Sequence, residues 1–382
     1  MGKFGKKNEI NLNPLAYNVA LGGEAGIGKS TLIKEVCEKL VGEDGYLSLD
    51  VGREDGHKAI SGIITESVPD WATYMEVIDD IVENKESDYP NLKVVVIDTY
   101  DQLCSIAEKE AIRLYNKKMM AAEKPKVDTI NAAWGSYGRG LEKTIELMLD
   151  SLWKLKSVGI SFILIFHVKK TNMTDVITDE QYSILTSDTT QKYFNAVKTK
   201  LDFLGMAYLD RDIIKVKTGR KDSKGKEIEK GKLAGESRVI SFRDDTYSVD
   251  SKCRFANIVD RIPFDSDEFI KAMQDAILAE QSKDGISVAD AKKKQDKAAK
   301  EAAKEASENS RKAKEDKIDE DLNAELVETI TVSFKGCTDK EKKTEFKALL
   351  KELAPEASSI DSLVEMPTKI VQKLSDFWNE EE

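Results

Sequence analysis

The chain has 382 residues, of which 40% are hydrophobic, and it carries 59 Lys and Arg against 70 Asp and Glu, for a formal net charge of −11. The length predicts two or three domains, and the hydrophobic content excludes a wholly disordered chain. The acidic balance excludes a generally basic nucleic-acid coat, so any contact with DNA must come from a local patch.

No apolar run approaches the roughly 18 residues that cross a bilayer, and the N-terminal segment lacks the apolar core of a signal peptide. The four cysteines lie far apart with no CxxC pair, and there are only two histidines. This pattern argues against a zinc site or a disulfide framework. We therefore expect a protein of the reducing cytoplasm that makes no membrane contact.

Short apolar runs alternate with longer amphipathic stretches up to about residue 209. The runs are typical of strands and the stretches of helices. Predicted strands cover residues 17–21, 45–50, 93–98, 160–167 and 201–209, and predicted helices cover 29–40, 71–82 and 144–158. Strands that alternate with helices imply right-handed crossovers and a mostly parallel sheet in an α/β fold. Residues 212–219 and 237–243 predict a β-hairpin extension around a turn rich in Gly and Lys.

The character of the chain changes after about residue 285. Residues 286–335 contain neither Gly nor Pro. Within them, residues 287–321 are rich in Ala, Lys and Glu without an apolar stripe, which favours an exposed helical spacer or a partly disordered linker. Apolar periodicity then returns and predicts a small acidic helical module. The expected parts are an N-terminal arm (1–16), an α/β core (17–282), a charged helical linker (283–322) and the small module (323–382).

The strongest motif is GEAGIGKS at residues 23–30, which satisfies GxxxxGK[ST] between a predicted strand and a predicted helix. Glycines let backbone N–H groups turn inward around phosphates, and the N-terminus of the following helix adds partial positive charge. Lys29 is expected to reach the β- and γ-phosphates, and the Ser30 hydroxyl to ligate Mg²⁺. The predicted nucleotide-binding residues are Gly23, Glu24, Ala25, Gly26, Ile27, Gly28, Lys29, Ser30 and Thr31.

Hydrolysis needs a second magnesium ligand and a group that orients or deprotonates water. Asp98 ends the apolar run 93–98, so its carboxylate is expected at the same sheet edge as the phosphate loop, although it could instead cap the next helix. For the water, Asp50 and Glu54 rank above Asp101 and Gln102. Each of these four has a solvated loop residue as its alternative.

Three further positions have open interpretations. His167, after the run 160–166, is either a structural histidine or a sensor of the γ-phosphate. Lys169 and Lys170 are either solvated or directed at phosphate. Arg139 is an arginine finger for a neighbouring subunit, a DNA contact, or neither.

Five segments of the chain carry a resemblance to a known family and occur in the family's order, namely GGEAGIGKST, YLSLD, KVVVIDTYDQL, GISFILIFHVKK and KLDFLGMAYLDRD. On these segments the chain resembles the RecA-like P-loop ATPases of phages, often called phage nucleotide-binding proteins. Some of these are ATP-dependent single-strand annealing or recombination proteins. The resemblance covers roughly residues 15–280. It implies a RecA-like NTPase core, ATP and Mg²⁺ at residues 23–31 with Asp98, and a homo-oligomeric ring or filament with ATP between subunits.

The resemblance also implies DNA-binding loops at about residues 121–137 and 168–191. One feature departs from the family. A catalytic glutamate usually ends the second strand, whereas this chain reads LSLDVGRED there, with Asp50 in that neighbourhood and Glu54 displaced. The identity of the general base therefore stays open, and slow turnover is compatible with this departure.

The clearest basic concentration in the core is residues 213–232, with eight Lys and Arg against three acids. Such a cluster could hold DNA phosphates or could be a solubilising hairpin tip. Tyr137, and less so Trp134, could stack unpaired bases or be buried against the sheet. The DNA-binding candidates are Tyr137, Arg139, Lys169, Lys170, Lys215, Lys217, Arg220 and Lys221.

The sequence leaves two main hypotheses for function. The first is a Mg²⁺-dependent ATPase of phage DNA recombination or replication that acts on single-stranded DNA. The second is a nucleotide-switched adaptor or helicase loader, whose C-terminal module recruits a phage or host replication protein. A small-molecule kinase shares the phosphate loop and is a more distant third.

Overall fold

The computed structural model describes residues 10–52, 56–135, 138–175, 178–221, 227–243, 249–282, 320–355, 357 and 359–379. The chain divides into two compact units, one within residues 1–304 and one within residues 305–382. Among the described residues, no helix is both long and apolar enough to span a membrane.

The first unit is built on a 10-stranded sheet with the order β10-β8-β7-β1-β5-β4-β2-β3, while β6 pairs with β5 and β9 with β7. The strands are β1 (Val19–Gly23), β2 (Tyr46–Val51), β3 (Thr65–Val68), β4 (Val94–Asp98), β5 (Ser161–Thr174), β6 (Gln181–Ser187), β7 (Phe203–Lys221), β8 (Glu227–Ser241), β9 (Lys252–Cys253) and β10 (Arg261–Pro263). Strands β7, β1, β5, β4, β2 and β3 run parallel in that order, which confirms the predicted RecA-like α/β class.

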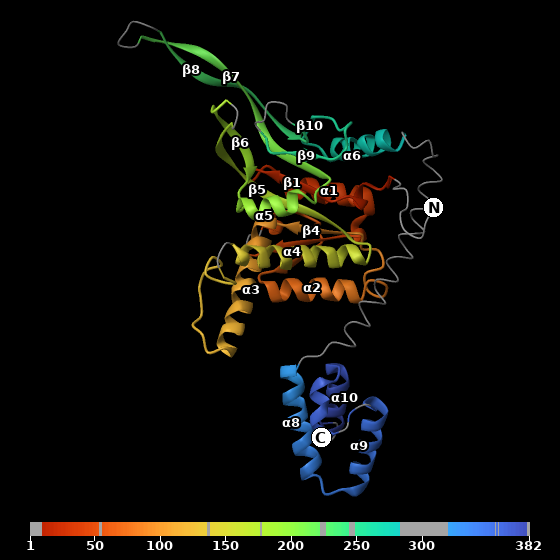
Figure 1. The fold of residues 1–382 in the computed structure, drawn as a ribbon. Helices are drawn as coiled ribbons and strands as arrows, with labels where there is room; N and C mark the ends of the chain where they lie inside the picture. Colours follow the sequence, from red (N-terminus) through yellow and green to blue (C-terminus); the bar gives the residue numbers. More distant parts are fainter. Residues whose placement is uncertain are drawn as a thin grey trace, which may run out of the picture. The chain divides into compact units, whose positions relative to one another are not determined.

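Helices cover both faces of this sheet, as the apolar runs require (Figure 1). They are α1 (Lys29–Val41), α2 (Trp71–Glu83), α3 (Tyr100–Ala121), α4 (Arg139–Ser157), α5 (Gln191–Lys198) and α6 (Ser266–Gln281). Val94 and Val96 share a core with the apolar sides of α1 and α6. On the opposite face Phe162 contacts Trp153 of α4, and Phe166 contacts Phe194 of α5.

Strand β5 differs from the prediction, because it does not end at His167. It continues to Thr174 and pairs with antiparallel β6 from Val168↔Ser187 to Thr174↔Gln181. The predicted second DNA-binding loop, residues 168–191, is therefore largely a β-hairpin. The polar sequence from Val168 onward favours a loop, but cross-strand pairing with β6 continues the ladder.

Strands β7 and β8 form the predicted hairpin extension, which projects beyond the other strands of the sheet (Figure 1). The segments 201–209 and 212–219, expected as separate strands, form the single strand β7, which begins at Phe203. Its register with β8 shifts between Asp212 and Ile213, so a bulge marks the place where the extension begins.

The segment between α3 and α4 is anchored on α3 by Trp134. Its indole Nε1 donates a hydrogen bond of 2.9 Å to the carbonyl oxygen of Ala111, and its ring centroid lies 5.8 Å from that of Tyr115. Trp134 is thus half-buried and packs on helix α3 rather than against the sheet, where the sequence analysis placed its buried alternative. Tyr137 lies outside the described residues.

In the second unit, residues 320–379 as described form the α-helices α8 (Glu320–Gly336), α9 (Lys340–Leu353) and α10 (Thr368–Asn379). Phe346 is fully buried at its centre, and the Trp378 ring lies 5.0 Å from the Phe346 ring between centroids. The unit therefore has its own apolar core. Its remaining buried apolar residues are Val327, Ile330, Ala354, Leu363, Val371 and Leu374.

Candidate nucleotide site

The phosphate loop follows β1 and leads directly into α1. Gly26 has φ of +77° and Gly28, the N-cap of α1, has φ of +104°, a region that side-chain-bearing residues rarely adopt. No side chain caps the N-terminus of α1 in the described structure. The first-turn N–H groups of α1 therefore suit an anion, which is the arrangement that a polyphosphate requires.

Lys29 is buried and turned back onto its own loop. Its Nζ donates to the carbonyl oxygens of Gly23 at 2.9 Å and Glu24 at 3.0 Å. These bonds satisfy an ammonium group that would otherwise be costly to bury. The Lys29 ammonium group is thus held beside the space where phosphates are expected, and a rotation of its side chain would direct it at them.

Ser30 and Asp98 meet although they lie 68 positions apart in sequence. The Ser30 hydroxyl donates to Asp98 Oδ2 at 2.5 Å, and Asp98 is the last residue of β4 and 7% exposed. A hydroxyl and a carboxylate provide the hard oxygen ligands that Mg²⁺ prefers, with phosphate oxygens and water completing the coordination. No group of three or more His, Cys, Asp or Glu in the described residues could hold a metal ion without such additional ligands.

His57 is a site residue that the sequence does not single out. It lies in the short 3₁₀-helix η3 (Gly56–Ala59), is 5% exposed, and places Nε2 at 2.9 Å from Asp98 Oδ2. Its Nδ1 lies 2.6 Å from Thr65 Oγ1. Because a carboxylate can only accept, we assign the proton to Nε2, and Nδ1 then accepts from the Thr65 hydroxyl. The sequence feature that could have pointed to His57 is its position six residues after the end of β2, near the expected edge of the sheet.

The candidates for orienting or deprotonating water lie in different places in the structure. Asp50 is the register partner of Asp98 on the neighbouring strand. It lines a cavity of about 230 Å³ beside the phosphate loop, called the nucleotide cavity below. Glu54 lies outside the described residues. Asp101 instead accepts from the backbone N–H of His167 at 2.7 Å and contacts its Nδ1 at 3.0 Å. Asp50 is therefore the described carboxylate best placed to orient water.

His167 lies at the wall between two cavities. It lines the nucleotide cavity together with Lys29 and Asp98. It also lines a neighbouring cavity of about 480 Å³, which includes Asp188 and Tyr193. The contact with Asp101 fixes the orientation of its ring. His167 thus borders both cavities directly before the part of β5 that pairs with β6.

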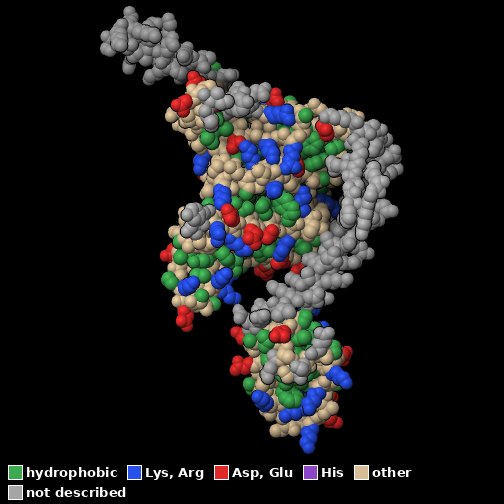
Figure 2. Space-filling model, viewed as in Figure 1, with side chains coloured by type: hydrophobic (Ala, Val, Ile, Leu, Met, Phe, Trp, Pro, Cys, Tyr) green, Lys and Arg blue, Asp and Glu red, His purple; other side chains and the backbone are tan. Residues whose placement is uncertain are grey.

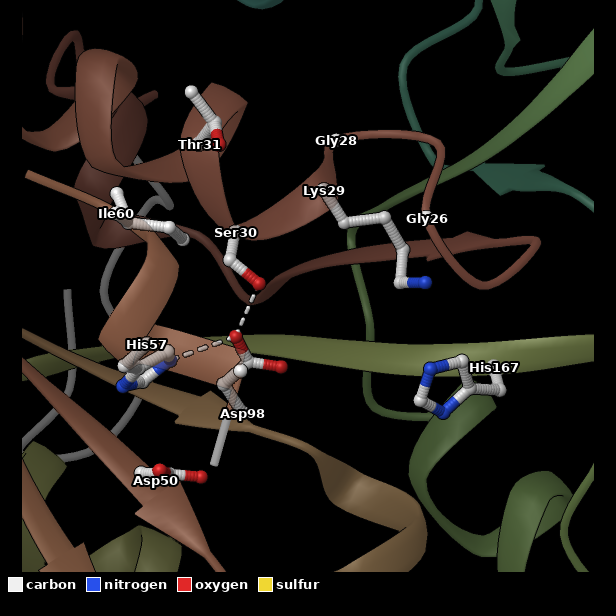
Figure 3. A pocket seen from close by; sticks show the side chains of 11 residues that line it. Gly26, Gly28, Lys29, Ser30, Thr31, Asp50, His57, Ile60, Asp98 and His167 are labelled. Carbon is white, nitrogen blue, oxygen red and sulfur yellow. Dashed lines mark hydrogen bonds and ion pairs between the residues drawn. The ribbon is translucent and has the colours of Figure 1, made fainter. Parts of the chain in front are cut away.

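These side chains enclose one cavity of about 230 Å³ beside the phosphate loop (Figure 3). In that view Lys29 and His167 lie on one side of Asp98 and His57 on the other. The cavity brings together Lys29, Ser30, Thr31, Asp50, Asp98 and His167 from the sequence analysis and adds His57 and Ile60.

The predicted DNA-binding residues that the structure describes lie outside this cavity. Arg139 is exposed at the first position of α4. Lys169 and Lys170 are exposed on β5, and Lys169 Nζ forms a 3.3 Å ion pair with Asp188. Lys215, Lys217, Arg220 and Lys221 belong to the backbone of β7, but their side chains lie outside the described part of the structure.

A basic groove, which the sequence does not single out, runs along α3. It encloses about 620 Å³ and is lined by Lys109, Ile112, Arg113, Asn116, Lys117, Met120, Ala121 and Lys126. Lys109, Arg113 and Lys117 are spaced by four residues and so share one helix face. The Asn116 side chain donates to the Val127 carbonyl and accepts from its N–H, both at 2.8 Å, which anchors the opposite wall. Figure 2 shows Lys and Arg side chains interleaved with hydrophobic ones over this part of the molecule.

Comparison with known proteins gives one family match. The family model described as an AAA domain matches residues 15–255, which is more than half of the chain and includes the whole nucleotide cavity. No curated protein matches the chain.

Proposed function

Because the chain belongs to the AAA-domain family of P-loop ATPase domains, we propose that it hydrolyses ATP with Mg²⁺ and uses the cycle to hold and release single-stranded DNA. The observation that carries the ATPase part is the contact between Ser30 Oγ and Asp98 Oδ2 beside Lys29, inside one cavity. By the same proposal the protein acts in phage recombination or replication as a homo-oligomer.

The residues divide the work of hydrolysis among them. The loop N–H groups and Lys29 bind the phosphates, and Lys29 exchanges two backbone carbonyls for phosphate oxygens when it does so. Ser30 and Asp98 hold Mg²⁺, which supplies charge neutralisation and polarisation of the γ-phosphate. Asp50 orients the attacking water, and His167 responds to the γ-phosphate through its place in the cavity wall.

The proposal is tested by measuring phosphate release by the full chain with and without Mg²⁺ and single-stranded DNA, at low and moderate salt. Magnesium-dependent hydrolysis that DNA stimulates is the expected result. Magnesium-dependent hydrolysis at the same rate with and without DNA would support the ATPase part of the proposal and contradict the coupling to DNA. A chain that neither binds nor hydrolyses ATP would overturn the whole proposal.

The basic groove is the described surface that best supports DNA binding, since its four cations sit in a chain of net charge −11. The double substitution Lys109→Glu with Lys126→Glu is expected to weaken single-stranded DNA binding. It should also flatten the dependence of log Kd on log salt by about 0.7 for each DNA phosphate that the groove no longer neutralises. Fluorescence anisotropy over a salt series measures both.

The control is Lys271→Glu, which reverses one charge, as either groove substitution does alone, at an exposed position on α6, far from the groove in sequence and on a helix of the other sheet face. It should leave the salt slope unchanged. If the groove variant and the control weaken binding equally, net charge rather than the groove governs the interaction.

A nucleotide-switched adaptor is the second candidate, and the separate helical unit within residues 305–382 favours it. Deletion of residues 305–382 discriminates the two. The first proposal expects ATP-dependent DNA binding to survive the deletion. The adaptor hypothesis predicts that the shortened chain no longer recruits its partner but still hydrolyses ATP.

A further inference from the structure

We propose that His57 is a positioning residue of the magnesium site, which fixes the carboxylate of Asp98 in the orientation that the metal requires. The inference rests on the proposed binding of ATP with Mg²⁺ and names a residue that acts through Asp98 rather than on the nucleotide. It follows from how the hydrogen bonds are distributed over the two oxygens of this carboxylate.

Both donors to Asp98 fall on the same oxygen. Ser30 Oγ lies 2.5 Å and His57 Nε2 2.9 Å from Oδ2. Within the described residues nothing is bonded to Oδ1, and Figure 3 shows that this oxygen points to the side of the cavity where Lys29 and His167 lie. One oxygen is thus anchored, and the other is presented to the phosphate side.

Two anchors on one oxygen restrict rotation of the carboxylate about its Cβ–Cγ bond. With Ser30 as the one donor, the carboxylate plane could swing about that hydrogen bond, and the second oxygen would have no fixed direction. His57 approaches from η3, whereas Ser30 approaches from α1, so a swing that keeps one hydrogen bond breaks the other (Figure 3). The pair therefore defines the plane of the carboxylate and the direction of its second oxygen before any ligand arrives.

The imidazole is itself held in place. Thr65, in β3, lies 2.6 Å from His57 Nδ1, and the ring is 5% exposed. The Asp98 carboxylate fixes the tautomer that carries its proton on Nε2, and the Thr65 hydroxyl, donating to Nδ1, holds the orientation of the ring. With both nitrogens engaged and the ring buried, His57 is unsuited to deprotonating water, which leaves orientation of Asp98 as its chemical role.

Two conservative substitutions separate this role from simple packing. The amide nitrogen of Gln lies near the position of Nε2, so His57→Gln can still donate to Asp98. The amide of Asn lies near the position of Nδ1, so His57→Asn can reach only the Thr65 side. Both are polar, uncharged and smaller than or similar to histidine, and they differ mainly in which hydrogen bond survives.

The measurement is the affinity of the full chain for a fluorescent ATP analogue, titrated in EDTA and over a series of Mg²⁺ concentrations. We expect His57→Asn to raise the half-saturating Mg²⁺ concentration by about 10- to 100-fold, the usual effect of losing a hydrogen-bond partner behind a metal ligand. His57→Gln should stay within about threefold of wild type. Affinity in EDTA should be the same for all three proteins, because the phosphate loop is untouched.

Thr65→Val is a second variant that leaves His57 in place and removes only the hydrogen bond that holds its ring. It should raise the half-saturating Mg²⁺ concentration by less than His57→Asn does, with unchanged affinity in EDTA. Equal effects of Asn and Gln at position 57, a wild-type response of the Asn variant, or a matching loss in EDTA would each overturn the inference while the proposed function stands. A wild-type chain that binds the analogue without any gain from Mg²⁺ would overturn both.

Discussion

Substitution of Lys29 by Ala is expected to lower ATP hydrolysis by at least about 100-fold, because it removes the cation that compensates the charge on the transferred phosphoryl group. In the structure the ammonium is held by two carbonyl oxygens of its own loop, at 2.9 and 3.0 Å. Those bonds keep it in the cavity between turnovers. Steady-state phosphate release at saturating Mg²⁺ measures the loss.

The matched control is Lys34→Ala, five positions further along α1. Lys34 forms an i,i+4 ion pair with Glu38 at 2.7 Å and does not line the cavity. A pair of this kind contributes little, so hydrolysis should be unchanged. Activity of the Lys29→Ala protein within about fivefold of wild type would show that the phosphates bind elsewhere, provided that both variants melt at similar temperatures.

The phosphate loop and Asp98 could be predicted because their signals are local. In the loop from Gly23 to Ser30, the positions of the glycines predict the backbone conformation, since glycine readily adopts the φ of +104° found at Gly28. Asp98 follows a fully apolar run, and the carboxyl ends of parallel strands share one sheet edge. The contact between Ser30 and Asp98 follows from these two facts and the order of the strands.

His57 could not be predicted in the same way, because its role depends on contacts between distant segments. It reaches Asp98 across 41 positions, and only after η3 has folded back beside β2 and β3. Nothing in the polar sequence around it distinguishes it from a solvated loop residue. The extension of β5 beyond His167 escaped prediction for a related reason, since pairing with β6 rather than apolar alternation defines it.

The neighbouring carboxylates of Asp50 and Asp98 explain why this sheet edge is suited to a cation. They are register partners on adjacent parallel strands, and both line the cavity. Two negative charges so arranged stabilise a bound divalent cation and cost the empty protein free energy. In the proposed function, the site trades stability of the nucleotide-free chain for metal binding, as is common at functional sites.

This trade predicts opposite effects of Asp98→Asn on function and on stability. Asparagine keeps the shape of aspartate, and its amide oxygen can still accept from Ser30 and His57, whereas the buried negative charge is removed. Without nucleotide the variant should melt at the same temperature as wild type or higher. Hydrolysis should fall by at least about 100-fold, because magnesium loses its carboxylate ligand.

Thermal melting with and without ATP and Mg²⁺ separates the two effects. At a ligand concentration of 100 times Kd, binding stabilises the wild-type fold by about 2.7 kcal/mol, and the variant should lose most of the part that depends on Mg²⁺. Asp79→Asn, which removes a half-buried carboxylate paired with Lys154 at 2.8 Å, is the control and should retain the whole stabilisation. If Asp98→Asn melted lower without ligand and kept its response to Mg²⁺, Asp98 would be a structural residue of β4 and magnesium would bind elsewhere.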